Sequence, residues 1–168
     1  GICGSGLIDI VAQLRLAGLL DDGGAMMSRE QAEEAGHPLA AFLLVRDEVK
    51  AFRLHGDVVL TQQDVRALQF AKGAISTGIE TAMRALGVAP SDLDSVMLAG
   101  SFGSYINPQS ARVVGLVPPV PVERIKAEQA DLGVDRANLG DFLVGRKRIG
   151  VADIGFLAVL QFKPPVFH

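Results

Sequence analysis

Apolar side chains recur every three or four residues in two long stretches of the chain, which is the spacing of one face of an α-helix. The first stretch covers residues 7–20. The second begins at Thr61, a residue type that favours helix N-caps, and Asp64 follows three positions later, as in a capping box. Its regular spacing continues as far as Gly87, a residue type that commonly ends helices. The pattern therefore predicts helices over residues 7–20 and 61–86.

Shorter apolar runs predict β-strands and one further helix. The predicted strands cover residues 42–45, 49–54, 58–60 and 95–99. Residues 55–57 contain a glycine and would join the second and third strands in a hairpin. After the fourth strand, Asn107 and Pro108 are suited to the N-cap and first turn of a short helix that extends to Val113.

The composition fits a mixture of helices and strands and narrows the functions open to the chain. Of its 168 residues, 49% are apolar, 19 are glycine and none is tryptophan, which is typical of a soluble α/β protein with many tight turns. With a formal net charge of −3, the chain lacks the excess of positive charge typical of proteins that bind nucleic acid or an anionic membrane. No apolar run is long enough to span a bilayer. Cys3 is the single cysteine, so no internal disulfide can form and a reducing cytoplasm is expected.

A glycine-rich segment, Gly1 to Gly6, opens the chain ahead of the first predicted helix and without an initiator methionine. Glycines in such a place let backbone N–H groups approach an anion. A purely structural turn explains the segment equally well, because its spacing is not that of the dinucleotide-binding fingerprint and no strand precedes it. From this opening we expect the chain to be a fragment of a longer protein.

A second candidate for ligand binding is the turn that follows the predicted strand 95–99. It consists of Gly100, Ser101, Phe102 and Gly103. In open α/β sheets, ligands bind beyond the carboxyl ends of strands, where such turns lie. The two glycines would leave room for a purine or a ribose. A tight strand–helix turn with no ligand is an equally good explanation.

The third candidate is the polar face of the long predicted helix. Its members are Gln62, Asp64, Arg66, Gln69 and Lys72. A solvated helix face is the commoner explanation of such a pattern. In the functional alternative, Arg66 or Lys72 reaches a nucleotide.

Neither the cysteine nor the histidines indicate a metal site. We expect Cys3 to be a small buried packing residue rather than a nucleophile or a cluster ligand. His37, His55 and His168 lack the spacing of metal ligands, and one cysteine cannot hold an iron–sulfur cluster. We therefore expect no bound metal in this chain.

Taken in order, several segments resemble one protein family. They are residues 1–9, 60–66, 71–75, 98–106, 110–111 and 115–118. These segments look like the C-terminal domain of the reductive activators of corrinoid proteins, in the ASKHA superfamily of actin, sugar-kinase and heat-shock-chaperone ATPases. The resemblance implies an α/β fold, an actin-like (ribonuclease-H-like) half-domain with a mixed sheet. In it, strand 95–99 would be central and helix 61–86 would pack on the sheet.

The resemblance also implies an activity for the parent protein. Such a protein uses ATP with Mg²⁺ to drive an electron from a [2Fe–2S] cluster, in an N-terminal ferredoxin-like domain absent here, to a corrinoid protein. The cobalt then returns from Co(II) to Co(I). The partners would be the corrinoid protein and an electron donor, and a homodimer is compatible with the family.

Site residues follow from the same resemblance. The turn of Gly100, Ser101, Phe102 and Gly103 resembles the adenosine-binding turn of the superfamily. Arg66 and Lys72 lie on the helix that can face the base and ribose, and Gly4, Ser5 and Gly6 would line the cleft near the phosphates. The catalytic residues are left unassigned.

Two departures from the family pattern bear on this interpretation. The acidic, glycine-rich phosphate loop that places Mg²⁺ has no counterpart here, so we expect it upstream. Residues 1–125 form the predicted actin-like part, whereas residues 126–168 resemble nothing in the family and need not fold natively. Two alternatives therefore stay open: a nucleotide-binding module that acts on a non-corrinoid partner, and a fragment with no activity of its own.

Overall fold

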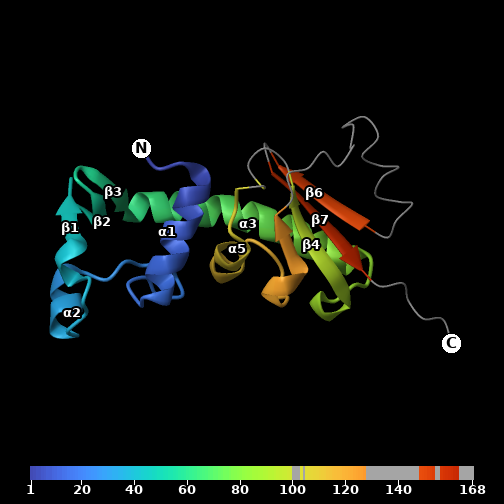
Figure 1. The fold of residues 1–168 in the computed structure, drawn as a ribbon, viewed down its shortest axis with the longest axis horizontal. Coiled ribbons are helices and arrows are strands. Elements are labelled where there is room, and N and C mark those ends of the chain that lie inside the picture. The colour runs from blue at the N-terminus through green and yellow to red at the C-terminus, as the bar shows by residue number, and fades with distance from the viewer. Residues whose placement is uncertain (100–102, 104, 128–147, 154–155, 163–168) are drawn as a thin grey trace. The chain divides into compact units, whose positions relative to one another are not determined.

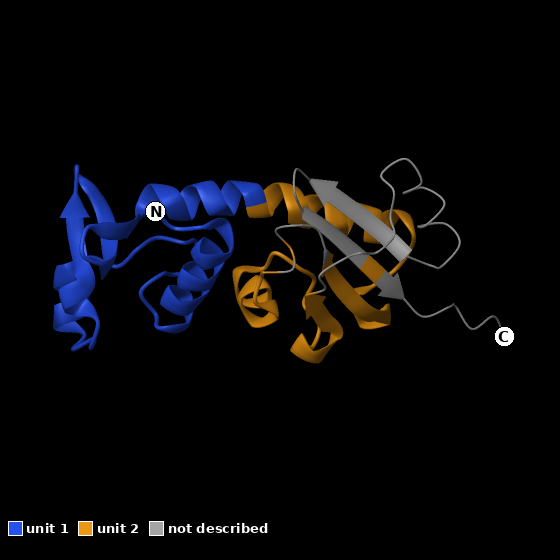
Figure 2. Ribbon diagram, turned by 45° about the horizontal axis from the view of Figure 1, so that its top comes forward, with its two compact units in different colours: residues 1–71 blue, residues 72–168 orange. Residues whose placement is uncertain are grey.

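The computed structural model describes residues 1–99, 103, 105–127, 148–153 and 156–162. The chain divides into two compact units, Gly1–Ala71 and Lys72–His168, which we call unit 1 and unit 2 (Figure 2). The boundary falls inside one continuous helix, α3 (Gln62–Ala85). Over the described ranges, no helix combines the length and the apolar character needed to cross a membrane.

Unit 1 consists of two helices, a small antiparallel sheet and the first part of α3 (Figure 1). Its other elements are α1 (Gly4–Leu16), α2 (Arg29–Glu34), a 3-10 turn (Ala40–Phe42), β1 (Leu43–Arg46), β2 (Val49–His55) and β3 (Val58–Thr61). In the strand order β1-β2-β3, Leu43, Phe52 and Leu60 lie opposite one another. All three are buried, so one face of the sheet contributes to the core of the unit.

Unit 2 is built around a mixed sheet of four strands. Its elements after α3 are a 3-10 turn (Pro90–Asp92), β4 (Leu93–Ala99), α5 (Pro108–Val114), a 3-10 turn (Val122–Arg124), β5 (Ile125–Ala127), β6 (Arg148–Asp153) and β7 (Phe156–Phe162). The order β5-β4-β7-β6 makes β4 an internal strand, parallel to β5 and antiparallel to β7. Val96 of β4 lies opposite Ile125 on one side and Leu160 on the other, and all three are buried.

The predicted α/β class with a mixed sheet is confirmed by this arrangement. The predicted strand 95–99 is the internal strand β4, and the predicted hairpin is the pair β2–β3. Figures 1 and 2 both show the second half of α3 running alongside the sheet of unit 2. The predicted division at residue 125 stays a prediction. Strands β6 and β7 of the sheet both come from residues beyond that position.

Two predictions about helices need correction. The first helix begins at Gly4 rather than residue 7, and it ends at Leu16 rather than residue 20. It ends early because Gly18 adopts the left-handed conformation, with φ at 78°, and the chain turns back there. The structure also contains α2, which the apolar pattern does not predict. Ser28 and Gln31 form a reciprocal capping box that starts this short helix.

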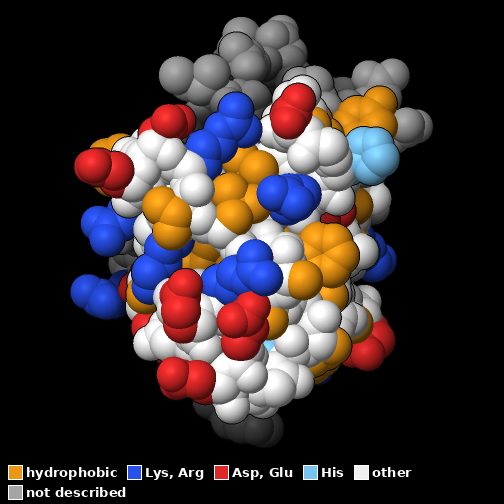
Figure 3. Space-filling view, turned by 90° about the vertical axis from the view of Figure 1, so that its left-hand side faces the viewer, with side chains coloured by type: hydrophobic (Ala, Val, Ile, Leu, Met, Phe, Trp, Pro, Cys, Tyr) orange, Lys and Arg blue, Asp and Glu red, His pale blue; other side chains and the backbone are white. Residues whose placement is uncertain are grey.

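The surface on the side of α2 and the β1–β3 sheet interleaves hydrophobic side chains with lysines and arginines (Figure 3). Val45 and Val58 are exposed apolar residues of these strands, and Arg46 and Arg53 are exposed cations among them. Acidic side chains share the same view. The mixture gives this face no field of a single sign.

Candidate functional site

The turn after β4 brings the backbone of Gly103 directly against the strand. Gly103 is buried, and a Cβ atom placed on it would lie 3.0 Å from the carbonyl carbon of Leu98. This distance is tighter than nearly all real Cβ contacts, so a side chain here would require the main chain at Leu98 to shift. Gly100, Ser101 and Phe102, the other predicted residues of the turn, lie outside the described residues.

A short helix follows the turn, as the sequence predicts. The Asn107 side chain accepts hydrogen bonds from the N–H groups of Gln109 and Ser110 and so caps α5. Gly115, in the left-handed conformation, ends the helix. The chain then enters β5, which is parallel to β4. The glycine turn therefore lies beyond the carboxyl end of an internal strand in a strand–helix–strand unit, a place where α/β proteins bind ligands.

Gly4, Ser5 and Gly6 make up the first turn of α1 rather than preceding the first helix. Their place near the phosphates of a nucleotide stays a prediction. Cys3 is the residue at the N-cap. The first helical hydrogen bond runs from Leu7 N–H to the Cys3 carbonyl oxygen, at 2.8 Å.

The expectation that Cys3 is buried is also wrong, because its side chain is exposed. The Sγ atom lies 3.6 Å from Ser5 Oγ. The hydrogen bond with Ser5, and then one from the Gly6 backbone, lower the pKa of the Cys3 thiol from its ordinary value. The sulfur atom therefore lies at the N-terminal end of α1. The resemblance to the family led us to expect the phosphates of a nucleotide near this end.

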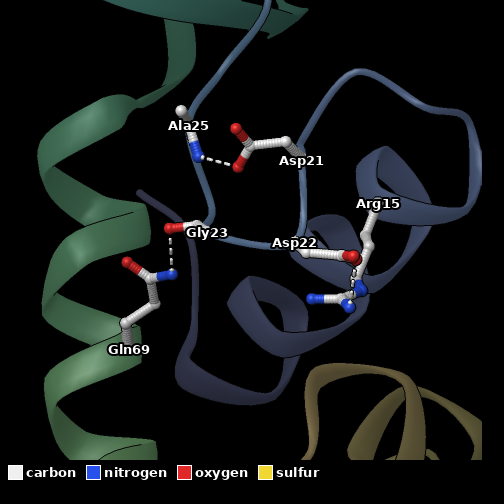
Figure 4. Close-up of polar contacts among 6 residues, drawn as sticks. All are labelled: Arg15, Asp21, Asp22, Gly23, Ala25 and Gln69. Atoms are coloured by element: carbon white, nitrogen blue, oxygen red, sulfur yellow. Dashed lines mark hydrogen bonds and ion pairs between the residues drawn. The ribbon is translucent and has the colours of Figure 1, made fainter.

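Most of the polar face of α3 has a structural role within unit 1. Gln62 donates a hydrogen bond from Nε2 to the carbonyl oxygen of Gly24, at 2.8 Å, and accepts one at Oε1 from Met26 N–H, at 2.6 Å. Gln69 donates from Nε2 to the carbonyl oxygen of Gly23, at 2.8 Å (Figure 4). The two glutamines, seven residues and so two helical turns apart, hold the loop after α1 against the helix.

The acidic member of that face caps α3. Thr61 N–H and Thr61 Oγ1 donate to Asp64 Oδ2, at 2.8 and 2.6 Å, and Asp64 N–H donates to Thr61 Oγ1 at 3.1 Å. The predicted capping interaction of Thr61 and Asp64 is therefore confirmed.

The two cations of this face differ in their surroundings. Lys72 is half-buried, and its Nζ atom lies 3.2 Å from where a Cβ of Gly115 would stand, at the carboxyl end of α5. An ammonium group is favourable near the carbonyl end of a helix. Arg66 is exposed and has no ion pair or hydrogen bond to the part of the chain that the structure describes. Contact of either residue with nucleotide stays a prediction.

Sequence reasoning missed two features of this region. It did not predict the lowered thiol pKa of Cys3, although a cysteine just ahead of a helix is a recognisable sign of a lowered pKa. It also did not assign Gln62 and Gln69 to the loop at Gly23 and Gly24. Their seven-residue spacing places them on one face of α3, but nothing local indicates which segment they bind.

Comparisons with known proteins agree with the fold. The family model described as the C-terminal domain of RACo, the ASKHA domain, matches residues 1–129. The corrinoid activation enzyme RamQ of Eubacterium limosum is 34% identical over 137 residues, which cover 74% of this chain and 23% of that protein. A solved structure of a reductive activator for corrinoid, iron-sulfur protein is 31% identical, with a TM-score of 0.62, and the match covers 75% of this chain and 20% of that one.

The chain thus spans less than a quarter of the length of these two relatives. The match to the family model covers the glycine turn, both glutamines of α3 and the whole of unit 1. The chain therefore belongs to the family of C-terminal ASKHA domains of RACo.

Proposed function

We propose that this chain supplies the adenosine side of the nucleotide site in an ATP-dependent reductive activator of a corrinoid protein. The observation that carries the proposal is the turn between β4 and α5, where Gly103 leaves no room for a side chain against Leu98. In open α/β sheets, ligands bind beyond the carboxyl ends of strands, which is where this turn follows β4. The membership of the ASKHA family supports the same use of the turn.

We infer that the turn contacts the adenosine of the nucleotide rather than its reacting phosphates. The glycines of the turn would leave room for a base and ribose, and Arg66 and Lys72 are the candidate contacts on α3. Gly4, Ser5 and Gly6 would lie near the phosphates, where the first N–H groups of α1 could contribute. The acidic groups that hold Mg²⁺ would come from the remainder of the longer protein, and ATP supplies the free energy of its hydrolysis to ADP and phosphate.

In the longer protein, the electron would come from a [2Fe–2S] cluster outside this chain. One electron reduces Co(II) of the corrinoid to Co(I), and an electron donor then reduces the oxidised cluster. RamQ is named a corrinoid activation enzyme, and the solved relative is named for a corrinoid, iron-sulfur protein. We infer a corrinoid protein as the partner here too, in a reducing cytoplasm, where the lone thiol of Cys3 would stay reduced.

Nucleotide binding to the 168-residue chain tests this proposal. Calorimetry with ATP and with ADP should give similar affinities, because both nucleotides carry adenosine. Gly100→Val, in the glycine turn, should abolish binding while the circular dichroism of the folded chain is kept. Gly73→Ala is the matched control, since a Cβ at Gly73 meets no atom within 4 Å.

Binding that survives Gly100→Val would move the adenosine site away from the turn. A well-folded chain that binds neither nucleotide would contradict a self-sufficient adenosine site and favour the alternative of a chain inactive on its own. The alternative of a non-corrinoid partner is decided in the longer protein. Failure to convert Co(II) corrinoid to Co(I), followed by the corrinoid absorbance, would support it.

A further inference from the structure

Unit 2 contains a cavity of about 670 Å³, and Gly103 is not among the described residues that line it. Among the described residues that line it are Val88 and Pro90, which precede β4, whereas the glycine turn follows the last residue of that strand. A seven-residue strand spans about 20 Å. This part of the cavity therefore lies at the opposite end of β4 from the turn.

One face of α3 forms a wall of the cavity. The lining residues of this helix are Ser76, Ile79, Glu80, Met83 and Arg84, which follow helical spacing. Ile79 and Met83 are almost completely buried, at 1% and 5% exposure. Ile79 and Met83 make the surface of this wall apolar. The charged residues Glu80 and Arg84 lie at its exposed edge.

The facing wall follows α5 and is rigid. Gly115 ends that helix with φ at 77°, and Val117, Pro118 and Pro119 continue the lining. Val117 and Pro118 are buried. Proline fixes its own φ, so this wall loses little conformational freedom when a ligand enters.

Positive charge dominates the edge of the cavity. Arg84 on α3 and Arg112 on α5 are exposed lining residues, and Glu80 is the acidic one. Neither guanidinium has an ion pair or hydrogen bond to any residue within the described ranges. Lys72 adds a third cation beside Gly115. An anion is therefore favoured over a cation or a neutral molecule.

We propose that this cavity binds an amphipathic organic anion, with its hydrocarbon part against Ile79, Met83 and Val117 and its charged group at Arg84 and Arg112. The volume lies within the range of about 300–1,000 Å³ that is usual for small-molecule sites, and an apolar lining with a few polar groups is their usual character. The proposal does not depend on the nucleotide function of the glycine turn.

Anilinonaphthalene sulfonate, an aromatic sulfonate whose fluorescence rises in apolar surroundings, is a suitable probe for the full chain. We expect saturable binding of one probe molecule. The double variant Arg84→Gln/Arg112→Gln should weaken it about tenfold, since two exposed charge contacts are lost. Ser76→Leu, which fills the cavity from α3, should weaken it further without loss of helical circular dichroism.

Arg53→Gln is the control for the arginine variants, because Arg53 is an exposed arginine of β2 in unit 1 and should leave the affinity unchanged. Addition of ADP should not displace the probe. Unsaturable binding, an unchanged affinity in the arginine double variant, or displacement by ADP would each overturn the proposal. The last result would instead make the cavity part of the nucleotide site, and none of the three depends on whether Gly100→Val affects ATP binding.

Discussion

Gly24 shows how one missing side chain can organise a loop. Its φ is 75°, and a Cβ there would overlap the side-chain amide of Gln69. Gly24→Ala should therefore cost about 2 kcal/mol, the sum of a left-handed alanine and the displaced Gln69 hydrogen bond. Urea denaturation measures this loss in the free energy of unfolding. Gly36→Ala is the matched control, because Gly36 has φ at 64° but open space around it, and it should cost about half as much. Equal costs for the two variants would show that Gln69 does not confine the loop.

Cys3 should ionise more readily than an ordinary cysteine. The pKa of its thiol is lowered from the ordinary value, chiefly by the hydrogen bond with Ser5. A lowered pKa means more thiolate at any given pH, so alkylation by iodoacetamide should reach half its maximal rate at a lower pH than for an unperturbed cysteine. Ser5→Ala should shift that midpoint upward, whereas Ser91→Ala, in the other unit, should not. A midpoint insensitive to Ser5 would rule out this hydrogen bond as the cause.

At the scale of elements, a substitution at one position of α3 should stabilise the helix. Gly73 lies in the helix interior, and a Cβ added there would meet no atom within 4 Å. Gly73→Ala should therefore stabilise the chain by up to about 1 kcal/mol, through helix propensity alone. Thermal unfolding should show a rise of about 2–4 °C in Tm. Gly103→Ala adds the same methyl group where its Cβ would lie 3.0 Å from the carbonyl carbon of Leu98. This variant should lower Tm. A fall in Tm for Gly73→Ala would reveal a close neighbour of α3.

Local signals in the sequence predicted the elements better than their contacts. The cap of α3 by Thr61 and Asp64 involves residues three apart, so it could be predicted and is confirmed. The hydrogen bond from Gln69 to Gly23 joins residues 46 apart, and no local pattern encodes such a partner. The same limit applies to Gly103. The sequence marked the turn, but the approach to Leu98 that makes glycine necessary depends on how the chain folds back over β4.

At the scale of the whole molecule, the sheet of unit 2 joins β4 to strands that come from residues beyond position 125. In the structure β7 lies between β4 and β6, and Leu160 of β7 pairs with Val96 of β4. Leu160 has 0% exposure. An internal β4 needs a neighbour on this side, because an unpaired strand edge invites aggregation. Residues 126–168 contain none of the segments that resemble the family, and the prediction of a divergent tail rested on that difference.

Leu160→Ala decides between the two views of residues 126–168. If β7 is part of the sheet, the variant removes a buried side chain and should cost about 2–5 kcal/mol, or about 5–15 °C in Tm. Leu86→Ala is the control, because Leu86 is 56% exposed and the same change should alter stability by less than about 0.5 kcal/mol. Thermal unfolding followed by circular dichroism compares the two. If both variants melt with the parent chain, residues 126–168 do not contribute to the folded sheet, and the family part must satisfy the edge of β4 by other means.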